Sequence, residues 1–355
     1  MAGSIASRWE ELSGKNNWDN LLNPLDLDLR RYLIHYIERA DTFRFIFNED
    51  KEAPGYALSR YPPEGLFPAN GLEVGNPFKY RVTKFIYAVA NGTLSEWIGY
   101  VAVATDEGKA VLGRRDILVS WRGTMTDEDV EEDKHFKTTS AEELFGPDEA
   151  AKVHTGFLSV YTTKLDDKPY SKTSAREQVL KAIQEQVDQY QNEEAVSITV
   201  TGHSLGGALA TLNAMDIVYN GHNKPSGNSD KSFMVTAFPV ASPHVGDNNL
   251  EQLFDRLNKD LDLHILRIEN AYDLVPIVLA FTNYGYTHVG QVLSIDASKS
   301  EELDFDIALV NKRGDFLLED MNIPTAWGNY TDFKGMAQMD DGHWKYVADY
   351  VPPTP

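Results

Sequence analysis

Five short runs rich in β-branched and aromatic residues are spaced along the middle of the chain. They are residues 97–104, 116–121, 196–201, 233–238 and 263–268. Runs of this length and composition are typical of strands that are buried on both faces of a sheet. The pattern therefore predicts a strand at each of them.

Two other stretches, 26–40 and 174–190, have apolar residues at helical spacing. In the second stretch a single stripe runs from Val179 to Tyr190. Such a stripe predicts an amphipathic helix packed against a sheet. His35 falls within the first helix, and we expect it to be a packed or surface residue and not a catalyst.

Strands that alternate with helices favour the α/β class, with a mostly parallel central sheet flanked by helices. The chain length of 355 residues fits one enlarged domain. We expect a single domain over 1–355, with a helical extension over 1–60 and a flexible tail over 340–355. In parallel sheets the chemistry lies at the carboxyl ends of the strands.

Composition excludes several classes of function. The net charge of −21 disfavours nucleic acid as a partner. The chain has no cysteine, so disulfides, thiolate metal sites and a cysteine nucleophile are excluded, and the histidines show no metal-binding spacing. We expect no cofactor and no metal. The chain has no signal-like segment and no long apolar run, so we expect no transmembrane segment and a cytoplasmic location.

The strongest chemical signal is Gly202-His-Ser-Leu-Gly206, which follows a predicted strand and opens into a helix-forming run. Strand, sharp turn and helix are what a nucleophile elbow of the α/β-hydrolase fold requires. Ser204 is therefore the candidate nucleophile of an ester hydrolase. The weaker alternative is a serine that only caps the helix.

Acyl transfer also needs two N–H donors for the oxyanion, one of them on the residue after the nucleophile. That residue is Leu205, at a helix N-terminus. For the second donor we select Thr124, because Gly123 lets the strand end at 119–121 approach the elbow. An ordinary strand-end turn is the alternative for this loop.

The third requirement is a carboxylate that orients a histidine, and in this fold the chain order is Ser, Asp or Glu, then His. Asp273 follows the run 263–268 on a loop that Pro276 ends. We predict that Asp273 lies at the carboxyl end of a strand.

Together these residues resemble plant class 3 lipases, and within them the cytosolic phospholipase A1-II type. The resemblance rests on motifs along most of the chain: 25–31, 97–108, 114–124, 153–161, 202–206, 241–247, 270–276, 286–290 and 306–312. It implies an α/β-hydrolase fold and a serine hydrolase that cleaves the sn-1 acyl chain of a glycerolipid or phospholipid. It also implies Ser204 as nucleophile, Asp273 as its charge partner, and Thr124 with Leu205 at the oxyanion hole. Peripheral contact with a membrane surface fits such a substrate.

The chain departs from that family after the strand near residue 295. Family members carry there tens of residues that hold the catalytic histidine, whereas this chain has only 297–305, without a histidine. His288 and His343 are the remaining candidates that follow Asp273 in the chain. His203 and His244 precede it and belong to other motifs.

A second departure is the segment 126–137, where lipases of this type often carry a lid. It is mainly acidic and has few apolar residues, which weakens the case for interfacial activation. A lid and a solvated loop both remain open.

Two functions follow from these observations. The first is a working lipid acyl hydrolase with a serine acyl-enzyme. The second is a catalytically impaired lipase-fold protein that binds lipid or a partner, because no histidine can be assigned as the base. A histidine nitrogen within hydrogen-bond reach of the Ser204 hydroxyl would distinguish them.

Overall fold

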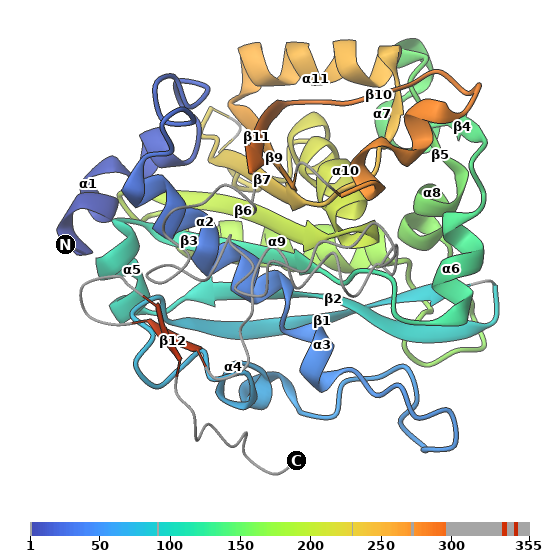
Figure 1. The fold of residues 1–355 in the computed structure, drawn as a ribbon, viewed down its shortest axis with the longest axis horizontal. Coiled ribbons are helices and arrows are strands. Elements are labelled where there is room, and N and C mark those ends of the chain that lie inside the picture. Colours follow the sequence, from blue (N-terminus) through green and yellow to red (C-terminus); the bar gives the residue numbers. More distant parts are fainter. Residues whose placement is uncertain are drawn as a thin grey trace.

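A computed structural model describes residues 2–90, 92–228, 230–270, 273–295, 336–338 and 344–346. Its centre is a seven-stranded sheet in the order β1-β2-β3-β6-β7-β9-β11 (Figure 1). The strands are β1 (Tyr80–Ala90), β2 (Leu94–Ala104), β3 (Arg115–Trp121), β6 (Val196–His203), β7 (Met234–Val240), β9 (Leu263–Asn270) and β11 (Gln291–Ile295). The pairs β1–β2 and β2–β3 are antiparallel, and every pair from β3 to β11 is parallel. The predicted α/β class with a mostly parallel sheet is confirmed.

All five predicted strands are present, and every residue of β3, β6 and β7 is buried. Strand β1 was not predicted, because its sequence carries charged residues such as Arg81 and Lys84 on an edge of the sheet. The alternation of side chains along β3 sends Ile117 and Val119 to one core and Leu118 to the other. The sheet is therefore covered on both faces.

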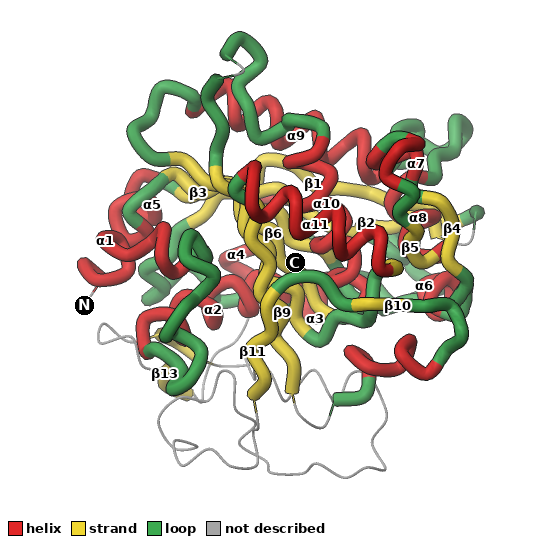
Figure 2. The backbone as a smooth tube through the Cα atoms, turned by 90° about the horizontal axis from the view of Figure 1, so that it is seen from above, coloured by secondary structure: helices red, strands yellow, loops and turns green. Residues whose placement is uncertain are grey.

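One face is covered by α1 (Ala2–Leu12) and α2 (Leu27–Ala40), the other by α8 (Thr155–Thr162), α9 (Ala175–Tyr190), α10 (Leu205–Tyr219) and α11 (Asn248–Leu261). Figure 2 shows the two helical layers on either side of the strands. Both predicted helices begin at a capping side chain. Asp26 accepts from two backbone N–H groups, and Ser174 forms a capping box with Glu177.

The remaining elements are short. They are α3 (Phe43–Ile46), η1 (Pro63–Gly65), α4 (Leu66–Ala69), α5 (Asp106–Leu112), α6 (Asp127–Asp133), β4 (Thr138–Ser140), α7 (Glu142–Phe145), η2 (Pro147–Glu149), β5 (Lys152–His154), β8 (Gly246–Asp247), η3 (Val275–Phe281), β10 (Tyr286–Thr287), β12 (Met336–Gln338) and β13 (Trp344–Tyr346). Strands β10, β8, β5 and β4 form a second, smaller sheet. Within the described residues, every helix is too short or too polar to span a bilayer. The predicted tail over 340–355 lies outside the described residues except for the backbone of β13.

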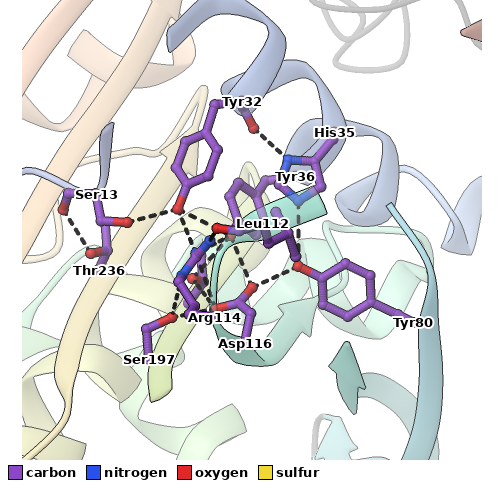
Figure 3. Close-up of polar contacts among 11 residues, drawn as sticks. Ser13, Tyr32, His35, Tyr36, Tyr80, Leu112, Arg114, Asp116, Ser197 and Thr236 are labelled. Atoms are coloured by element: carbon purple, nitrogen blue, oxygen red, sulfur yellow. Dashed lines mark hydrogen bonds and ion pairs between the residues drawn. The ribbon is translucent and has the colours of Figure 1, made fainter. Parts of the chain in front are cut away.

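A buried polar network joins α2 to the amino-terminal half of the sheet (Figure 3). The Arg114 guanidinium donates to the Ser197 hydroxyl (2.7 Å) and to the Tyr36 hydroxyl (2.8 Å). The Asp116 carboxylate accepts from the hydroxyls of Tyr36 (2.9 Å) and Tyr80 (2.6 Å). All of these side chains are buried, so the network fixes the helix on the sheet at a set position.

His35 lies beside this network and is fully buried, with its ring 4.3 Å from the ring of Phe78. Burial lowers the pKa of His35 well below its ordinary value, and the nearby Arg39 adds to the effect. The histidine is neutral and packed, as the sequence predicted.

Candidate active site

Ser204 occupies a sharp turn between β6 and α10. Its backbone lies at φ 54° and ψ −122°, a strained conformation for a residue with a side chain. The turn is too crowded for side chains on its flanking glycines: a Cβ on Gly202 would lie 2.2 Å from the Gly206 carbonyl oxygen. The Ser204 hydroxyl does not cap α10, so the helix-cap alternative does not explain this serine.

The loop after β3 lies beside this turn. Strands β3 and β6 are parallel, and Trp121 of β3 pairs with Gly202 of β6. Thr124 lies three residues after Trp121, and Leu205 lies three residues after Gly202. A Cβ on Gly123 would lie 2.8 Å from the His203 carbonyl oxygen, so only glycine allows this approach. The structure therefore brings together Ser204, Leu205 and the loop that carries Thr124.

Buried charges hold this loop, which is not an ordinary strand-end turn. The Arg122 guanidinium forms an ion pair with Asp129 at 2.6 Å. Asp129 in turn accepts from the backbone N–H groups of Met125 (2.8 Å) and Thr126 (2.9 Å). Although burial opposes ionisation, Arg122 and these hydrogen bonds lower the pKa of Asp129 to about 2.

The Thr124 hydroxyl donates to Asp133 at 2.7 Å. Burial raises the pKa of Asp133 to about 7. Burial likewise raises the pKa of Glu96 well above its ordinary value, although Arg122 lies 2.8 Å away. Arg122, Asp129 and Asp133 were not among the predicted site residues; the only signal was an acidic cluster within 12 positions of a strand-end arginine.

The acidic segment 126–137 is a solvated loop only in part, because residues 134–137 are exposed and lie outside any helix. Residues 127–133 form α6, which Thr126 begins with a capping box. Asp129 and Glu132 are buried, and Asp129 pairs with the buried charge of Arg122. Whether the segment acts as a lid stays a prediction.

Asp273 lies at the same edge of the sheet. It follows β9, whose neighbour β7 ends at Val240, and the Val240 carbonyl accepts from the Ser204 N–H at 2.9 Å. Asp273 is buried, and one of its carboxylate oxygens accepts from the Val275 N–H at 2.9 Å.

His288, one of the two candidate bases, packs against His244 and lies near Glu269. Its ring stacks on His244 with a centroid distance of 3.6 Å, and its Nε2 lies 3.9 Å from a carboxylate oxygen of Glu269. Burial lowers the pKa of His288 to about 3 and that of His244 to about 4. The role of His288 as the general base therefore stays a prediction.

Two other histidines named from the sequence are His203 and His343. His203 is buried beside Gly123, and burial lowers its pKa to about 3. His343 lies outside the described residues. In the described part of the chain, no group of three or more histidine, aspartate and glutamate side chains could hold a metal ion.

Comparisons with known proteins agree with this geometry. The class 3 lipase family matches residues 118–283, which span β3 to η3. Lip2 lipase from Yarrowia lipolytica has the same fold, with a TM-score of 0.50 at 22% identity over 76% of this chain and 80% of that one. The fold and the site define an α/β-hydrolase that acts on carboxylic esters.

Sequence relatives narrow this class. Phospholipase A1-IIgamma of Arabidopsis thaliana is 39% identical, with 97% of this chain and 93% of the relative covered. Phospholipase A1-II 1 of Oryza sativa subsp. indica is also 39% identical, with 98% and 97% covered. The chain therefore belongs to the class 3 lipase family, together with its phospholipase A1-II members, and is an acyl-ester hydrolase.

The same alignments bear on the short interval after β11. The alignment with the Arabidopsis relative runs over 397 positions, more than the 355 residues of this chain. The relative thus has tens of residues without a counterpart here. That these residues belong after β11 stays a prediction from the sequence.

Proposed function

We propose that the protein is a phospholipase A1, which hydrolyses the sn-1 acyl ester of phospholipids. The observation that carries this proposal is the strained Ser204 turn, held between β6 and α10 and next to the Thr124 loop. The names of the relatives supply the substrate class. They are named as enzymes, which favours an enzyme over a protein that only binds lipid.

In this proposal the Ser204 hydroxyl attacks the ester carbonyl, the C–O bond to glycerol breaks, and the lysophospholipid leaves with the proton taken from Ser204. Water then hydrolyses the acyl-enzyme and releases the fatty acid. The backbone N–H groups of Thr124 and Leu205 stabilise the oxyanion of each tetrahedral intermediate. The helix dipole of α10 adds a partial positive charge at Leu205. Asp273 orients the histidine that accepts the Ser204 proton.

Ser204→Ala tests the nucleophile. We expect turnover of a short-chain aryl ester to fall by at least ~10³-fold, because the covalent route is lost. The far-ultraviolet circular dichroism of the variant should match that of the wild type. Equal rates for the two proteins would contradict the proposed role of Ser204.

His343→Ala and His288→Ala test the two candidate bases separately. Loss of a general base lowers kcat by about 10²–10⁴-fold. His288 already contacts His244 and Glu269, so we expect the loss to follow the His343 substitution. If neither substitution lowers kcat, the proposed histidine base is wrong.

Regiospecificity and location complete the proposal. A phosphatidylcholine with a labelled acyl chain at sn-1 should release label, whereas the same lipid labelled at sn-2 should not. A cytoplasmic location is consistent with a chain that has no cysteine. Cell fractionation with a tagged chain would test the location.

A further inference from the structure

An uncharged stretch follows Asp273. No Asp, Glu, Lys or Arg occurs over 274–295, although one residue in four of the whole chain is charged. Its first part is η3, which is made of Val, Pro, Ile, Leu, Ala and Phe. A run without charge is unusual in a protein of net charge −21, and it is largely apolar.

The η3 segment presents most of these apolar side chains to solvent. Pro276 and Leu279, three positions apart, point inward and are buried. Ile277, Val278 and Phe281 point outward, and Phe281 is 80% exposed. With Leu274 and Tyr284, five of the twelve large apolar side chains that the described residues expose lie within 11 positions. We call this surface, Leu274 to Tyr284, the apolar rim.

The apolar rim is attached firmly to the catalytic edge. The Asp273 carboxylate accepts from the Val275 N–H at the start of η3. On the inner side, the Pro276 carbonyl lies close enough to His244 and His288 to act on the pKa of both. Figure 1 shows the segment, in orange, leading into β10. A surface that touches the apolar rim therefore also lies close to Asp273.

We propose that the apolar rim is the surface by which the enzyme docks on zwitterionic phospholipid bilayers. The proposal rests on the proposed function, since a phospholipid substrate reaches the enzyme as a surface. Exposed apolar side chains in an uncharged segment insert at the boundary between headgroups and acyl chains. A net charge of −21 opposes anionic surfaces and leaves zwitterionic ones accessible. The segment 126–137, where lipases of this type often carry a lid, is mainly acidic and does not supply such a surface.

Binding to vesicles tests the docking surface independently of catalysis. In a Ser204→Ala background, sedimentation with phosphatidylcholine vesicles reports binding without hydrolysis. Adding Phe281→Ser should weaken binding about tenfold, and Phe281→Ser with Ile277→Ser about a hundredfold, because each removes a large apolar side chain from the lipid. Both side chains are exposed, so the melting temperature should not change.

Val74→Ser is the matched control, because Val74 is also apolar, uncharged and 89% exposed. It should leave vesicle binding within about twofold of the background protein. About 30% phosphatidylglycerol in the vesicles should weaken binding at low salt, and high salt should restore it.

Three results would overturn the docking surface: no binding of the background protein to phosphatidylcholine vesicles, unchanged binding of the double variant, or equal loss in the Val74 control. A dimer that dissociates on Phe281→Ser would assign the apolar rim to contact between copies instead. None of these results touches the aryl-ester assay, so failure of the docking surface and failure of the proposed function are separate outcomes.

Discussion

Two buried arginines border strand β3, and their surroundings differ. Arg114 precedes the strand and is surrounded by one carboxylate, Asp116, and by neutral hydroxyls. Arg122 follows the strand and faces three carboxyl groups, those of Glu96 and Asp129, which are buried, and that of Asp133, which is partly buried.

The difference in charge balance explains their different roles. Around Arg114 each guanidinium nitrogen has a partner, and a satisfied network acts as rigid support. Around Arg122 the carboxyl groups outnumber the one cation; burial, with a smaller contribution from the charge of Asp129, raises the pKa of Asp133 to about 7. The Arg114 network supports α2, whereas Asp133 holds the candidate oxyanion loop through the Thr124 hydroxyl.

We expect the largest effect on stability from replacing Arg114, whose charge is balanced by its buried partners. Arg114→Met leaves Asp116 buried without its cation, and we expect a loss of about 3–5 kcal/mol in the free energy of unfolding. Urea denaturation would measure it. Arg8→Met is the control, because Arg8 makes partly exposed ion pairs with Asp26 and Asp28 and its loss should cost ~1 kcal/mol or less. Similar losses for the two variants would contradict the greater stabilisation that we assign to the buried Arg114 network.

Asp133→Asn tests the cluster around Arg122, where the carboxyl groups outnumber the cation. The folded pKa of about 7 lies above the ordinary value of 3.8, so the folded state holds a proton that the unfolded state releases. Asp133 therefore reduces stability progressively as pH rises from about 4 to 7, and the cost remains above pH 7. The variant should be roughly 1–3 kcal/mol more stable than the wild type at pH 8 and equally stable at pH 3.5.

The same substitution should lower kcat for a soluble ester by about tenfold, because the neutral amide accepts more weakly from the Thr124 hydroxyl and so holds the loop that presents the Thr124 N–H less firmly. The wild-type rate should show an inflection near pH 7 that the variant lacks. An identical pH profile in the two proteins would show that Asp133 does not act on the oxyanion loop.

Ser204→Gly should have the smallest effect on stability. Glycine adopts a positive φ without steric cost, so the variant should gain about 1 kcal/mol in the free energy of unfolding while losing turnover. Thermal unfolding with Ser204→Ala as reference measures this, since alanine keeps the strain. A less stable glycine variant would mean that the turn is not strained.

The sequence by itself determined most of the sheet and the placement of Ser204. Buried strands and capped amphipathic helices have local periodic patterns, and glycines at a crowded turn leave a readable spacing. The order Ser204 then Asp273 also follows from strand ends. Strand β1 was not predicted from the sequence, because an edge strand tolerates charged side chains.

Only the tertiary structure decided how charges and apolar side chains are distributed. Asp129 of α6 turns inward because Arg122, at the end of β3, is buried beside it, whereas Asp127 and Glu131 of the same helix are exposed. Residues 275–281 are all apolar, yet their side chains largely face solvent beside Asp273. Burial and pKa depend on neighbours that lie far away in the chain, and no local pattern records those neighbours.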